Sequence, residues 1–148
     1  MLAAAAAVAL ALVFSGGGGK PSLSKAQYSR TVTAALTRLA ADFRAAGDQA
    51  QTSASLRRMK AALDRAAQRL DRVHAPKSAA PAHRALVGEL RDYAAQVDLV
   101  RASVDFGDPA TVVVHLREVT APAQINRTLD TLVAKGYDIP VRIARVRR

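Results

Sequence analysis

The fold follows from residues 53–105, which read SASLRRMKAALDRAAQRLDRVHAPKSAAPAHRALVGELRDYAAQVDLVRASVD. In the first half, apolar residues recur every three or four positions, namely Leu56, Met59, Leu63, Ala66, Leu70 and Val73. The second half repeats this spacing with His83, Leu86, Leu90, Tyr93, Val97, Val100 and Val104. Because residues three or four apart share one helix face, each half predicts a helix with a largely apolar seam. We expect Pro76 to stop the first of these helices and Ser78 to cap the second. The proline-containing turn between them predicts an antiparallel helical hairpin.

One further helix is expected on each side of this hairpin. The earlier one starts near Ser22 or Ser24, ends at Gly47, and has a stripe of Tyr28, Val32, Leu36, Leu39 and Phe43. The later one opens at Asp108–Pro109, a cap followed by proline, and its stripe is Val112, Leu116 and Val119. Pro122 interrupts that stripe, which resumes at Ile125, Leu129 and Leu132 with Val133. The sequence therefore predicts an all-α, up-down four-helix bundle whose fourth helix is kinked or broken at Pro122.

The two ends of the chain differ from this helical region. Residues 1–14 are apolar and Ala-rich, which is short of the ~20 residues of a membrane span but typical of a signal-peptide core. No Lys or Arg precedes the run, so a start further upstream and an N-terminal tail without signal function both stay open. We expect a signal-peptide-like leader at 1–15, a Gly-rich linker at 16–22, the bundle at 23–138 and a basic C-terminal arm at 139–148. The arm is interpreted as mobile, with a short strand or disorder as alternatives.

Several chemistries are excluded or lack support. The chain has no cysteine, which excludes disulfides, thiolate catalysis and zinc–cysteine sites. The run from Gly16 to Lys20 resembles a phosphate loop, but Pro21 stands where Ser or Thr must hold magnesium. The three histidines, His74, His83 and His115, lack metal-binding spacing, and no GxSxG nucleophile motif occurs. We assign no catalytic, cofactor-binding or metal-binding residue and expect a protein without enzymatic activity.

Charge is the remaining functional signal. The formal net charge is +10, and most basic residues are Arg. Such a chain associates with anionic partners, although GC-rich coding DNA also raises Arg and Ala content. The candidate anion- or partner-binding residues lie on the second helix and in the C-terminal arm: Arg57, Arg58, Arg65, Arg69, Arg72, Arg142, Arg145, Arg147 and Arg148. Aromatic residues are only 4%, which argues against stacking on single-stranded nucleic acid but leaves phosphate contacts with duplex DNA open.

Four short segments carry a resemblance to a known group. They are the apolar leader with its Gly-rich spacer, Leu23-Ser24-Lys25-Ala26-Gln27-Tyr28, Ala75-Pro76, and Lys135-Gly136-Tyr137-Asp138-Ile139. Together they resemble uncharacterised secreted or lipoprotein-like helical proteins of high-GC actinobacteria. The resemblance implies a location in the cell envelope and a helical bundle, and it implies no activity. The chain lacks the Cys that receives lipid in lipoprotein leaders, so lipid anchoring by that route is excluded.

These observations lead to two functional expectations. The first is an exported, non-enzymatic helical module of the cell envelope whose partner is an envelope protein, anionic lipid or acidic polysaccharide. The alternative is a cytoplasmic, basic, nucleic-acid-associated protein. Pairing with a second copy of the chain also stays open.

Overall fold

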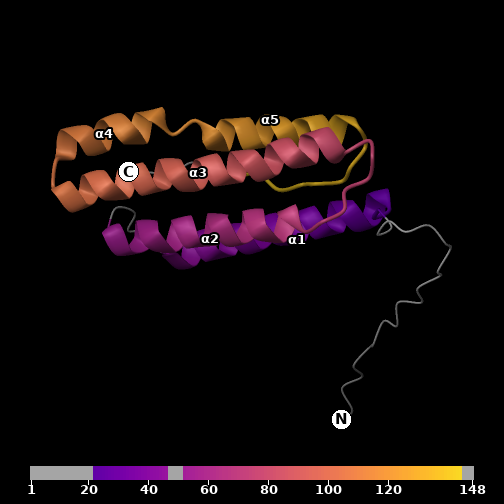
Figure 1. Cartoon of the computed structure of the whole chain (residues 1–148), viewed down its shortest axis with the longest axis horizontal. Coiled ribbons are helices and arrows are strands. Elements are labelled where there is room, and N and C mark those ends of the chain that lie inside the picture. The colour runs from indigo at the N-terminus through magenta and orange to yellow at the C-terminus, as the bar shows by residue number, and fades with distance from the viewer. Residues whose placement is uncertain (1–21, 47–51, 145–148) are drawn as a thin grey trace, which may run out of the picture.

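The computed structural model describes residues 22–46 and 52–144. Its helices are α1 (Lys25–Ala46), α2 (Ser53–Asp71), α3 (Ala80–Phe106), α4 (Pro109–Glu118) and α5 (Ala121–Ala134). Successive helices run in alternating directions, and α4 and α5 follow one another end to end as a single bent fourth helix (Figure 1). The prediction of an all-α, up-down four-helix bundle is confirmed.

The helices form two layers. Helix α1 packs on α2, and α3 packs on both α4 and α5, while the α2–α3 contact joins the two pairs (Figure 1). We call these the α1–α2 layer and the α3–α5 layer. Among the described helices, α1 does not pack on α4 or α5, so the ring of helices is open along that edge. The chain after α5 lies at this opening.

The predicted seams form the core. Leu56, Leu63 and Leu70 of α2 are fully buried. Leu86, Leu90, Tyr93 and Val97 of α3 are likewise inaccessible to solvent. Burial of apolar surface stabilises the folded state by about 25 cal/mol per Å², and this is the main contribution to the stability of such a hairpin. Helix α2 ends at Asp71, earlier than the expected stop at Pro76.

Local sequence signals place most helix ends. Ser24 and Gln27 form a reciprocal capping box, in which each side chain accepts from the other residue's amide. The Thr52 side chain accepts from the Ser55 amide at the start of α2. The expected cap at Ser78 is wrong: α3 has no side-chain cap, because the Ser78 hydroxyl instead pairs with the Tyr137 hydroxyl at 2.7 Å. Gly107 ends α3 in the left-handed region, with φ of 70°.

The fourth helix breaks just before the proline. Helix α4 ends at Glu118, and Pro122 lies in the first turn of α5, where its missing N–H costs no hydrogen bond. The Gln96 side-chain oxygen accepts from the amides of Thr120 and Ala121, both at 3.1 Å. These bonds satisfy backbone donors that the break would otherwise leave free. Of the two neighbouring residues expected on the resumed stripe, Leu132 is fully buried, whereas Val133 is 42% exposed.

The segment after α5 corrects the expectation of a mobile arm. Residues 135–144 run back along the opening between α1 and α5 (Figure 1). Tyr137, Ile139 and Ile143 are buried in the core cluster. The Asn126 side chain both donates to the Ile143 carbonyl and accepts from its amide, at 3.0 and 2.9 Å. As far as the structure describes the arm, this fixed segment belongs to the bundle.

Other expectations lie outside the described residues. They are the leader at 1–15, the linker up to residue 21, the helix end at Gly47, and the arm residues Arg145, Arg147 and Arg148.

Candidate basic surface

The layers differ sharply in charge. The basic residues from α1 to the end of α2 are Lys25, Arg30, Arg38, Arg44, Arg57, Arg58, Lys60, Arg65, Arg69 and Arg72. The acidic residues described over the same range are only Asp42, Asp64 and Asp71.

The α3–α5 layer is charge-balanced. Its basic residues, counted from residue 73 to 144, are Lys77, Arg84, Arg91, Arg101, Arg117, Arg127, Lys135 and Arg142. One acidic residue matches each of them: Glu89, Asp92, Asp98, Asp105, Asp108, Glu118, Asp130 and Asp138. The net positive charge of the described residues therefore comes entirely from the α1–α2 layer.

The predicted residues of α2 lie on its solvent-facing side. Arg57, Arg58, Arg65, Arg69 and Arg72 are all exposed, as expected for positions away from the seam. Arg65 also reaches α1, where it lies 3.3 Å from Asp42, the residue that pairs with Arg38 at 3.2 Å. A single carboxylate is thus shared by two guanidinium groups, which leaves the surface locally basic.

Arg142 is not part of this surface. It is exposed, but its guanidinium pairs with Asp130 of α5 at 2.6 Å. The structure therefore separates Arg142 from the α2 residues that were predicted to share its role.

Helix α1 contributes basic residues that the sequence interpretation missed. Arg30, Arg38 and Arg44 are exposed on α1. All three stand off the apolar stripe of α1, and this position is the sequence signal that they are exposed. Their membership in the surface depends on α1 packing beside α2, and a single helical pattern does not reveal which helices become neighbours.

A groove runs beside α1 on this layer. It has a volume of about 1010 Å³ and lies between α1 and the chain near Gly136 and Pro140. Lys25, Arg30 and Arg38 line it together with a single carboxylate, that of Asp138. Much of the remaining lining is Ala, Ser and Thr. The groove thus combines small side chains with three basic residues and one carboxylate.

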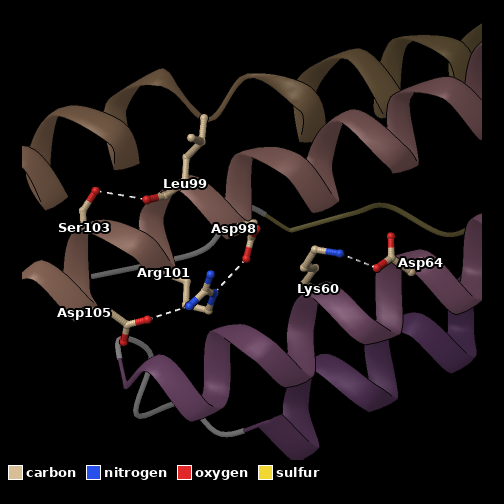
Figure 2. A network of polar contacts seen from close by, with 7 residues as sticks. All are labelled: Lys60, Asp64, Asp98, Leu99, Arg101, Ser103 and Asp105. Atoms are coloured by element: carbon tan, nitrogen blue, oxygen red, sulfur yellow. Dashed lines mark hydrogen bonds and ion pairs between the residues drawn. The ribbon is translucent and has the colours of Figure 1, made fainter.

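Several other charged groups pair with neighbours near the layer boundary (Figure 2). Lys60 lies 2.7 Å from Asp64 within α2, and that hydrogen bond raises the pKa of Lys60. On α3, Arg101 lies between Asp98 at 2.7 Å and Asp105 at 2.5 Å. Figure 2 shows both groups where α2 faces α3. These cations have close carboxylate partners, whereas among the described residues most of the outer α2 arginines have none.

A buried tyrosine–histidine pair joins α1 to α3. Tyr28 and His83 are buried, and the Tyr28 hydroxyl lies 3.1 Å from His83 Nδ1. The Tyr28–His83 contact crosses from one helix to the other, with the two rings edge-on at 5.6 Å between their centroids. Burial lowers the pKa of His83, against the opposing effects of the Leu70 carbonyl and Asp71. The Tyr28–His83 hydrogen bond thus links α1 to α3 inside the core.

A cavity of about 570 Å³ adjoins this pair and includes His74 and Asp71. A histidine and a carboxylate in one cavity are the usual parts of an acid–base site. Here the Asp71 carboxylate pairs with Arg91 at 3.0 Å, and Nδ1 of His83 is hydrogen-bonded to Tyr28. Both groups already have structural partners.

A serine–histidine contact occurs where α3 meets α4. Ser103 Oγ lies 2.6 Å from His115 Nδ1, beside an apolar cavity of about 360 Å³. The hydroxyl donates its proton to the Leu99 carbonyl at 3.0 Å, as Figure 2 shows. His115 must therefore donate to Ser103, which is the reverse of the proton transfer that activates a serine nucleophile. His115 is partly buried at this contact.

Among residues 22–46 and 52–144, no group of three or more His, Asp or Glu side chains is placed to hold a metal ion. Over the same ranges, none of the helices combines the length and hydropathy of a membrane span.

No protein-family model, curated protein or solved structure matches the chain. The surface is therefore interpreted from its own residues. Its chemistry is that of exposed guanidinium groups on one layer, which bind carboxylate, phosphate or sulfate groups.

Proposed function

We propose that the protein is an exported, non-enzymatic helical module of the cell envelope that binds an acidic partner through its α1–α2 layer. The observation that carries this proposal is that the net positive charge of the described residues is confined to that layer. Repeated guanidinium groups attract a chain or surface that presents many negative groups more strongly than a small ligand with one. Export is supported by the apolar run of residues 1–14 and the small residues that follow it.

The alternative is a nucleic-acid-associated protein of the cytoplasm. The same outer arginines favour it, because they suit backbone phosphates as well as carboxylates. Base stacking receives no support from this layer, since Tyr28 is buried and Phe43 is half-buried against Tyr93. Binding to duplex DNA by this surface would thus be insensitive to sequence and steeply weakened by salt.

Cell fractionation with N-terminal mass spectrometry tests the location. A chain recovered outside the cytoplasm, either cut near Ser15 or held at the membrane by an uncleaved leader, is the expected result. An intact Met1 in the cytosol overturns the exported module and favours the nucleic-acid alternative.

Binding measurements test the surface. Polygalacturonate and a random-sequence DNA duplex are titrated against the full chain at two salt concentrations. The double variant Arg57→Glu/Arg58→Glu is compared with Arg84→Glu/Arg127→Glu, which makes the same charge change on exposed residues of the other layer. We expect polymer binding to be lost in the first variant and retained in the second. Equal losses would mean that overall charge, and no particular layer, governs binding.

A further inference from the structure

The basic layer presents a long surface. Both helices extend for about 30 Å at 1.5 Å per residue. Exposed basic residues lie near the two ends of each helix, with Arg30 and Arg44 on α1 and Arg57 and Arg72 on α2. The charge is therefore spread over the layer, as suits a partner that is itself extended and anionic.

The exposed apolar residues lie elsewhere. The large apolar side chains exposed in the described residues are Leu99, Phe106, Val114 and Val133, which belong to α3, α4 and α5. Within its described residues, the α1–α2 layer thus offers charge and small side chains to a partner and no large apolar group that would insert into it. An acidic surface contacted in this way is held by electrostatic attraction, which salt weakens.

The chain enters the domain through the same layer. Ser22 is the first described residue, and the Leu23 amide donates to the His74 carbonyl beside the start of α1. The apolar run of residues 1–14 precedes this point by a linker of a few residues. Seven residues reach at most about 25 Å when fully extended. An apolar run held in a bilayer would therefore keep the start of α1 within about 25 Å of the lipid headgroups.

We propose that the acidic partner is an anionic lipid bilayer and that the α1–α2 layer lies against it. The arginines of both helices neutralise headgroup phosphates, and the charge-balanced α3–α5 layer faces away from the membrane. This inference rests on the proposed function, because it names the partner of the same surface. It adds an orientation, which can be measured independently of affinity.

The orientation is tested with single labels. Because the chain has no cysteine, Ala34→Cys on α1 and Ala123→Cys on α5 each provide one attachment site for a fluorophore. Both positions are exposed, so neither label enters the core. The full chain is bound to phosphatidylglycerol vesicles that contain headgroup nitroxide lipid. We expect strong quenching at position 34 and little at position 123, and equal quenching or the reverse order would overturn the proposal.

The charge requirement is tested with the matched variants. Each basic residue near an anionic membrane contributes roughly fivefold to partitioning. Arg57→Glu/Arg58→Glu should weaken binding to phosphatidylglycerol vesicles by at least about 25-fold, and Arg84→Glu/Arg127→Glu by less than about threefold. The full chain is used throughout, so the leader contributes equally. If the first variant loses helicity, Arg58→Gln replaces it, with an expected loss of about fivefold. Equal losses from both layers, or equal binding to phosphatidylcholine vesicles, would overturn the inference.

Comparison with soluble partners separates the two proposals. Binding to polygalacturonate without binding to phosphatidylglycerol vesicles would overturn the membrane orientation and leave the proposed function standing. Binding to duplex DNA alone would overturn the membrane orientation in favour of the nucleic-acid alternative. If the unmutated chain binds neither polygalacturonate, phosphatidylglycerol vesicles nor duplex DNA, both proposals are overturned.

Discussion

The α1–α2 layer and the α3–α5 layer share one core but present opposite kinds of surface. Both contribute fully buried leucines, such as Leu63 and Leu90, to the same cluster. Outside it, the first layer has unbalanced arginines and the second has matched charges together with exposed apolar residues such as Phe106. The difference shows that packing leaves the outer positions free to vary, because a seam constrains only every third or fourth residue.

The strongest test of the shared core is Leu90→Asp. Leu90 is fully buried, so the variant places a carboxylate in the seam without a partner. We expect a loss of more than about 4 kcal/mol in the free energy of unfolding, which is enough to unfold a marginally stable domain. Helicity and thermal melting followed by circular dichroism provide the measurement. Leu99→Asp is the control on the same helix, since Leu99 is 56% exposed and should tolerate the change.

The packed C-terminal segment gives the next largest effect. Ile139 is 1% exposed, so Ile139→Ala should destabilise the protein by about 2–4 kcal/mol through lost burial and a residual cavity. Val133→Ala, at an exposed position of α5, should change stability by less than about 0.5 kcal/mol. Urea denaturation of both variants measures the difference. Equal, small effects would mean that residues 135–144 do not belong to the bundle in solution.

A smaller effect is expected from helix capping in the two layers. Thr52→Ala removes a side-chain acceptor from the first turn of α2 and should cost about 1 kcal/mol. Thr120→Ala, just before α5, should cost much less, because the Thr120 side chain makes no capping bond. Thermal melts compare the pair, and a larger loss at Thr120 would contradict the assignment.

The mildest effect appears only in acid. Burial lowers the pKa of His83 below its usual 6.5, so the unfolded chain binds a proton more readily than the folded one. The stability linked to His83 is therefore fully present above about pH 6.5 and is lost as pH falls through the lowered pKa. His83→Gln should flatten this dependence between pH 7 and 5, while His74→Gln, at an exposed site, should preserve it. Urea midpoints measured across that range decide between the two outcomes.

Helix seams and breakers were predictable from the sequence because both are local signals. The apolar spacing placed Leu56 and Leu86 in the core, and Asp108 with Pro109 placed the start of α4. The Asp108 carboxylate accepts from the Thr111 hydroxyl and from the Ala110 amide, and these bonds lower its pKa. Such a cap needs only residues within one turn, so it can be read without knowing the fold.

The missed features depend on distant neighbours. Residues 135–144 pair with no strand, and their burial arises from the opening between α1 and α5, which no local pattern reveals. Ser78 is of a residue type that often caps helices, but its hydroxyl hydrogen-bonds Tyr137, which is 59 residues away. For the surface, the exposed arginines of α2 were predicted. Those of α1 were missed because their proximity to α2 comes from packing. The pairing of Arg142 with Asp130 of α5 likewise depends on packing.

The closure of the open edge also bears on when the molecule can fold during synthesis. The Asp138 amide donates to the Ser29 hydroxyl across 109 residues of sequence, and the Tyr137 ring packs edge-on against Tyr28. On a translating ribosome, the α2–α3 hairpin can form as soon as residue 106 has emerged, whereas these contacts require residues 137 and 138. In the nascent chain, α1 therefore lacks its contacts with residues 137 and 138 until most of the chain has been made.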